Sequence, residues 1–111
     1  MTITDIKQLP ELLDLIHDLW FNVETVILDS ATRFVNFRVT PNRSDLDKTS
    51  FPGITITVKN VEDLKIKDTE RVRDYDVNEI KFDRETRTLK LTTGIPIEII
   101  FRVTALEICV P

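Results

Sequence analysis

The chain is poor in the residues that build covalent, catalytic or metal-binding frameworks. Its 111 residues include one cysteine, one histidine and two glycines. The lone Cys109 excludes an intrachain disulfide, and with no signal-peptide pattern at the N-terminus it leads us to expect a reducing, cytoplasmic setting. No Gly-rich phosphate loop, C-x-x-C, H-E-x-x-H or G-x-S-x-G motif occurs. We therefore expect no cofactor, no metal and no enzymatic activity.

Long apolar runs and an excess of positive charge are also missing. The formal net charge is −4 and the pI is about 5.0. The longest apolar stretches are far shorter than the roughly 20 residues of a membrane helix. We expect neither a membrane nor a nucleic acid as a partner. With 41% hydrophobic and 31% charged residues, the composition is typical of one globular domain spanning residues 1–111.

One amphipathic helix is predicted near the N-terminus, at about residues 9–19. Its apolar positions recur at helical spacing, at Leu9, Leu12, Leu13, Ile16 and Trp20. Pro10 suits the first helical position, where its missing N–H would be unbonded in any case. Glu11 and Asp14 favour the positive end of the helix dipole.

After the helix, the apolar period changes to two, which is typical of half-buried strands. Eight segments show this alternation: 26–28, 35–39, 54–58, 64–66, 80–82, 89–91, 97–103 and 106–110. The expected fold is mainly β, with about eight antiparallel strands in a sandwich or a barrel. The N-terminal α-helix should cover one open edge or one end, because bare edges invite aggregation.

The two halves of the β region resemble each other. Residues 21–39 align without a gap on residues 75–93, and both contain D-x-x-T-R, beginning at Asp29 and Asp83. The Asp of such a turn can accept backbone N–H groups two or three residues later. We therefore interpret the chain as two four-strand repeats, at 21–67 and 75–110, that follow the helix.

Few residues suggest chemistry. His17, with Asp14 three residues earlier, could act as a general base, but a histidine near a helix C-terminus is also favoured by the dipole alone. Asp45 and Asp47 form a D-x-D that could hold a hard cation, yet the loop lacks the further carboxylates and the glycine of a calcium loop. At His17, Asp45 and Asp47 we favour a structural role over a catalytic or metal-binding one.

The segment 41–53 is the best candidate for specific binding. In the second repeat the equivalent strands are joined by Gly94, Ile95 and Pro96 alone. Hairpins need only about 2–5 loop residues, and long loops on a rigid scaffold are common recognition sites. A mobile insertion without function is the alternative, since loop length costs little free energy. The candidate contacts are Asn42, Arg43, Asp45, Asp47 and Lys48, with Phe51 as an anchor.

A second candidate surface is apolar. Four side chains are hydrophobic where the alternation would place polar ones: Ile27, Phe34, Ile100 and Cys109. We predict that the N-terminal helix or a symmetric dimer partner covers them.

Three classes of function compete. A non-enzymatic protein-binding module, such as an adaptor or an immunity-like protein, agrees best with an acidic, compact chain that has a protein partner or associates with itself. A small-ligand-binding β-barrel is the alternative, although its inward positions are nearly all aliphatic or Phe. A hydrolase or isomerase built around His17 is the third.

Overall fold

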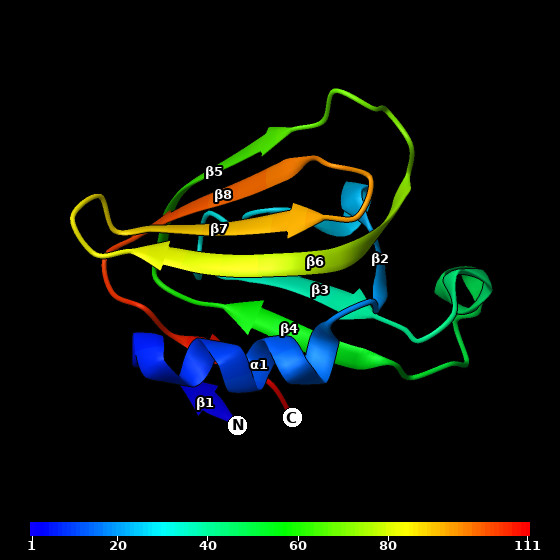
Figure 1. Cartoon of the computed structure of the whole chain (residues 1–111), viewed down its shortest axis with the longest axis horizontal. Helices are drawn as coiled ribbons and strands as arrows, with labels where there is room; N and C mark the ends of the chain where they lie inside the picture. Colours follow the sequence, from blue (N-terminus) through cyan, green and yellow to red (C-terminus); the bar gives the residue numbers. More distant parts are fainter.

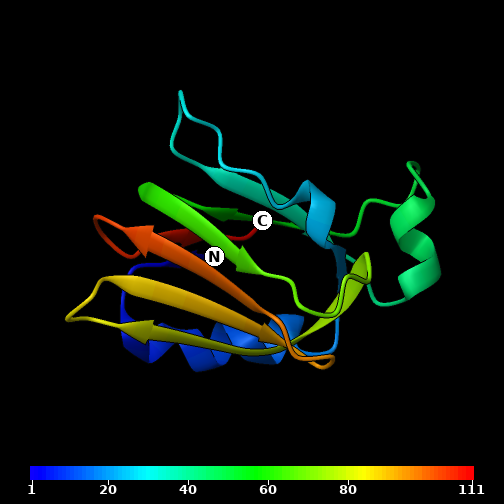
Figure 2. The same ribbon diagram turned by 90° about the horizontal axis from the view of Figure 1, so that it is seen from above.

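The computed structural model describes residues 1–111 and contains two antiparallel sheets that pack around a shared core (Figures 1 and 2). The four-stranded sheet has the order β1 (Thr2–Ile3), β9 (Ile108–Cys109), β4 (Ile54–Val58), β3 (Val35–Val39). The five-stranded sheet has the order β2 (Trp20–Asn22), β6 (Asp74–Asp83), β7 (Thr88–Thr93), β8 (Glu98–Val103), β5 (Val61–Lys67). The expected mainly-β fold is confirmed, as nine strands rather than eight.

The core follows from the alternation of the strands. Inward positions pair across the sheet, such as Phe37 with Ile56 in one layer and Leu91 with Ile99 in the other. The 25 buried hydrophobic residues of both sheets and the helix form one cluster. Burial of this apolar surface is the main favourable contribution to folding. The interior is therefore filled by side chains of the chain itself.

The helix α1 (Leu9–Ile16) follows a 3-10 turn, η1 (Ile6–Gln8), and lies alongside β6 (Figure 1). Its Leu9, Leu12 and Ile16 are buried in the core. It ends earlier than the predicted residue 19, because Asp18 adopts a left-handed φ of 66°. The chain then reverses to pair with β6, and Trp20 lies in β2 opposite Asp76. No helix has both the length and the apolar character required to cross a membrane.

Four strand assignments differ from the sequence-based expectation. Residues 26–28 form no strand; a 3-10 turn, η2 (Val23–Thr25), precedes them, and only a single bridge joins Leu28 to Val35. The segment 106–110 contributes only the two residues of β9. The strands β1 and β2 were not predicted, because two or three residues are too few to show alternation.

The two D-x-x-T-R turns have the same hydrogen bonds. Asp29 Oδ1 accepts from the N–H groups of residues 31 and 32 at 2.9 and 3.4 Å. Asp83 Oδ1 accepts from those of residues 85 and 86 at 2.9 and 3.4 Å. The closing residues, Arg33 and Arg87, have left-handed φ values of 62° and 55°.

Candidate binding surface

Residues 41–53, which we name the lobe, form a compact unit around the 3-10 turn η3 (Arg43–Asp47), on the right of Figures 1 and 2. Arg38 on β3 organises it. Its Nη2 donates to the carbonyls of Leu46 at 2.7 Å and Asp45 at 3.4 Å, and its Nη1 donates to those of Lys48 at 3.3 Å and Phe51. One guanidinium thus binds four carbonyls of the lobe, which fixes the backbone of the loop.

Gly53 closes the lobe. Its φ is +58°, in the left-handed region that favours glycine. A Cβ at this position would lie 2.6 Å from the Val39 carbonyl oxygen, which is backbone and cannot easily move aside. The return of the chain into β4 therefore depends on a residue without a side chain.

Asp45, predicted as a contact residue, is buried within the lobe at 6% exposure. Its carboxylate accepts from Lys48 Nζ at 3.0 Å and from Asn42 Nδ2 at 3.2 Å. The hydrogen bond from Lys48 is the main cause that lowers the pKa of Asp45, and the Asn42 amide adds to it. Asp45 and Asn42 therefore hold the lobe together, whereas Lys48 is 61% exposed.

An ionic network ties the lobe to the five-stranded sheet. Asp74 at the start of β6 is 5% exposed and accepts from Arg43 Nε at 3.1 Å and from Arg73 Nε at 2.8 Å. Arg73 also reaches back to Asp47, with Nη1 2.9 Å from Oδ1. The hydrogen bonds from Arg73 and then Arg43 hold the pKa of Asp74 below its usual range. The lobe is thus anchored on two sides.

Trp20 completes this region. The Arg43 guanidinium carbon lies 5.8 Å from the centroid of the Trp20 ring, within the range of a cation–π contact. The Trp20 backbone exchanges hydrogen bonds with Thr40, which places the ring beside the lobe. Trp20 is partly exposed, and Arg43, Asp47 and Arg73 are 61%, 66% and 40% exposed. We name these four residues the Arg43 surface.

Of the predicted binding residues, the structure brings Arg43 and Asp47 together on this surface. Phe51 is half-buried, and its carbonyl accepts from Arg38. Trp20, Arg73 and Asp74 were not predicted to belong to it. The contacts of Arg73 and Asp74 with the lobe span 26 and 31 residues, so no local pattern indicates them.

The four predicted interface residues do not form one patch. Ile100 lies on β8 in the five-stranded sheet, while Cys109 lies on β9 in the four-stranded sheet. Phe34 precedes β3, and the centroid of its ring lies 5.2 Å from Lys59 Nζ. Ile27 is 66% exposed. The helix packs on β6 and does not cover the four together, because they are distributed over both sheets and a loop.

His17 lies at the end of α1, with its Nδ1 3.1 Å from Asp18 Oδ2. Its ionic neighbour is therefore Asp18, rather than the predicted Asp14. The side chain of His17 is 46% exposed.

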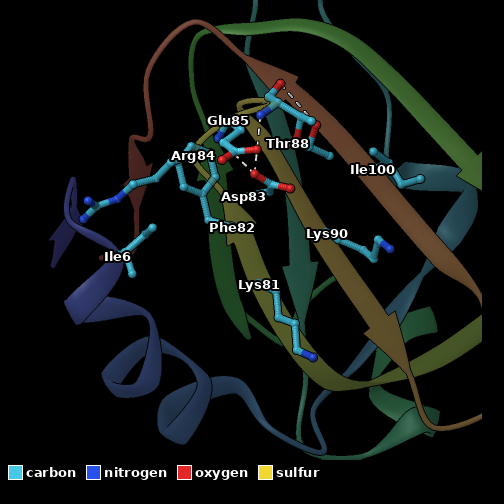
Figure 3. A pocket seen from close by; sticks show the side chains of 10 residues that line it. Ile6, Lys81, Phe82, Asp83, Arg84, Glu85, Thr88, Lys90 and Ile100 are labelled. Atoms are coloured by element: carbon cyan, nitrogen blue, oxygen red, sulfur yellow. Dashed lines mark hydrogen bonds between the residues drawn. The ribbon is translucent and has the colours of Figure 1, made fainter.

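A shallow cavity of about 780 Å³ lies over the β6–β7 hairpin (Figure 3). Lys81, Lys90 and Ile100 line it on the outer face of the sheet, and Ile6 of η1 lines it beside Phe82. Lys81 is paired with Glu79 at 3.2 Å and Lys90 with Glu98 at 3.0 Å. Both lysines are thus engaged within the chain, whereas Arg84, which also lines the cavity, is exposed and forms no ion pair, and none of the charged side chains of the cavity is buried.

Comparison with known protein families, curated proteins and solved structures finds no match to this chain.

Proposed function

We propose that this chain is a non-enzymatic protein-binding module, of the adaptor or immunity-like kind, and that a partner protein docks on the Arg43 surface. The observation that carries the proposal is the fixed geometry of that surface. Asp74 holds both arginines, and Arg38 holds the lobe beneath them. Side chains that are already ordered lose less conformational entropy when a partner binds.

The residue types on the surface also suit protein recognition. Trp and Arg are enriched among the residues that dominate binding energy at interfaces. Arg43 uses only its Nε for Asp74, so both of its Nη groups are free to donate. A planar pair of donors matches a carboxylate in bidentate fashion. We therefore expect the partner to present a carboxylate, with an apolar group that covers Trp20.

The ligand-binding alternative has less support. A ligand inside the fold would need space and convergent polar groups. The space between the sheets is filled by the apolar cluster, and the cavity in Figure 3 is open and shallow. The single cysteine supports our further proposal that the module works in the cytoplasm.

Affinity capture with two variants tests the proposal. Arg43→Glu reverses the charge at the centre of the surface, and a second variant replaces residues 41–53 by a short Gly-containing turn copied from Gly94 to Pro96. Arg84→Glu makes the same charge change at an exposed site in the β6–β7 turn and is the matched control. We expect a stoichiometric partner that binds the wild type and the control but not the two variants. Unchanged binding by folded Arg43→Glu and by the shortened chain would refute the site.

We also propose that the chain arose by internal duplication. The identical turn hydrogen bonds at Asp29 and Asp83 support it. So do the cross-strand pairs: Val35 faces Val58 as Leu89 faces Phe101, and Phe37 faces Ile56 as Leu91 faces Ile99. Val61 and Val103 occupy equivalent positions, because each donates its N–H to the carbonyl of the arginine that closes its turn, Arg33 or Arg87. The two valines face each other, as expected at a local two-fold axis between repeats. The predicted strand-for-strand match of residues 21–66 with 75–108 fails at residues 26–28, which form no strand although their counterparts 80–82 lie in β6. Residues 29–39 and 54–58 should superpose on residues 83–93 and 97–101.

A further inference from the structure

One long strand has a free edge. The five-stranded sheet ends at β5, which pairs with β8 alone and lies at the top of Figure 1. From Asp63 to Lys67 its backbone makes no hydrogen bond on the other side. The edges of β3 and β6 are different, because β3 is bridged at Val35 and β6 is flanked by β2 and α1. An unpaired strand edge is a template for pairing with another strand.

The charges along β5 fall into two groups. Glu62 pairs with Arg102 at 3.3 Å and Lys67 pairs with Glu98 at 3.7 Å, so both have partners on β8. Asp63 and Lys65 are exposed on the outer face and form no ion pair within the chain. The two charges without a partner are thus opposite in sign and two residues apart, on one face of the free edge.

We propose that β5 pairs with β5 of a second copy of this chain, antiparallel about a two-fold axis at Leu64. In that register Asp63 lies directly opposite Lys65 of the second copy, and Lys65 lies opposite its Asp63. Opposite charges that face each other across two strands stabilise the pair, whereas like charges destabilise it. A two-fold contact makes each favourable pair twice.

The inner face agrees with this register. Leu64 and Ile66 are only half-buried, since no strand lies beyond them. Pairing about Leu64 brings the two Leu64 side chains together and removes apolar surface from water. An axis one residue further along, at Lys65, would place two lysines opposite each other and would offer Asp63 only Lys67, which is already paired with Glu98. The charge pattern therefore selects the axis at Leu64, and the two five-stranded sheets become one continuous sheet.

Charge reversal at the two positions tests the contact directly. Asp63→Lys gives lysine at both 63 and 65, and Lys65→Asp gives aspartate at both. Each variant alone should dimerise at least about tenfold more weakly than the wild type, because two attractive pairs become repulsive. Mixed in equal amounts, the two variants should form a heterodimer, since every lysine then faces an aspartate. Sedimentation equilibrium from micromolar to millimolar protein measures the dissociation constants of the wild type, of each variant and of the mixture. Circular dichroism verifies that the variants are folded.

Lys67→Asp is the matched control, because it makes the same change as Lys65→Asp two residues further along β5. Lys67 lies beyond the regular pairing, because the bulge between Val61 and Asp63 of the second copy interrupts the register there. Its reversal should therefore leave the dissociation constant within about threefold of the wild type. A monomeric wild type at millimolar concentration and low salt would overturn the proposal. So would mixed variants that fail to associate, or a Lys67→Asp effect as large as that of Lys65→Asp.

Discussion

Asp74→Asn should separate the electrostatic from the steric role of the only buried carboxylate that joins the lobe to the sheet. The substitution keeps the shape but removes the charge that accepts from Arg43 Nε and from Arg73 Nε and Nη2, at 3.1, 2.8 and 3.1 Å. A hydrogen bond to a charged group contributes about 1.5–3 kcal/mol when it is well shielded. Both arginines are partly exposed and can turn to water, and the amide oxygen still accepts one bond.

The expected loss in the free energy of unfolding is therefore about 2 kcal/mol, which is less than the sum that three fully shielded hydrogen bonds would contribute. For a chain of 111 residues this corresponds to about 9 °C in Tm. Urea unfolding followed by circular dichroism measures it, and Asp63→Asn, exposed and without an ion partner, should change stability by less than about 0.5 kcal/mol.

The pH dependence gives a second measure of the same interaction. Folding lowers the pKa of Asp74, so its contribution is complete above the unfolded pKa of about 3.9 and is lost as pH falls through the folded pKa. The difference between wild type and Asp74→Asn should stay constant from about pH 7 to pH 5 and narrow only below about pH 4. A variant as stable as the wild type, or a difference that does not narrow in acid, would refute the reasoning.

Three further predictions concern single sites. Gly53→Ala should destabilise the fold by about 2 kcal/mol in urea unfolding, because an L residue is strained at this φ and its Cβ meets the Val39 carbonyl; a neutral effect would contradict the assigned backbone. Tyr75, the only tyrosine, is buried and donates to Asp68, which together raise its pKa to about 12. The tyrosinate absorbance of the folded protein should therefore appear near pH 12, and stability should fall as pH rises above the unfolded pKa of about 10; ionisation near pH 10 in a folded chain would exclude this burial. Asp29→Ala and Asp83→Ala should each cost about 1 kcal/mol in urea unfolding and agree within about 0.5 kcal/mol, since each removes the same two turn bonds; clearly unequal losses would count against the duplication.

The sequence predicts the strands with clear alternation well, because period two over five or more residues has no competing interpretation in this chain. It fails at Trp20, which continues the apolar spacing of the helix but belongs to β2. The end of α1 is decided by the left-handed turn at Asp18 and by pairing with β6, which are tertiary effects. Residues 26–28, which are Val, Ile and Leu, were predicted as a strand but form only one bridge, since η2 occupies the chain just before them.

The candidate binding surface was predictable only in part. The unusual length of the segment 41–53 identified the lobe, and Arg43 was among its candidate contacts. Asp45 looks like a surface carboxylate in sequence, but the Lys48 ammonium and the Asn42 amide allow it to be buried. Arg38 looks like an ordinary outward residue of β3, and nothing local indicates that its guanidinium reaches carbonyls up to 13 residues away.

Because Arg38 binds the backbone of the lobe, the shape of the lobe depends little on its side-chain sequence. The four acceptors of Arg38 are backbone carbonyls, which every amino acid possesses, so the guanidinium does not depend on which side chains the lobe carries. Exposed positions such as Ser44, Thr49 and Ser50, whose side chains form no hydrogen bond, can be exchanged while the path of the backbone is kept. A library of lobes with new side chains at these positions, built on a constant Arg38 and Gly53, would present varied surfaces on one scaffold.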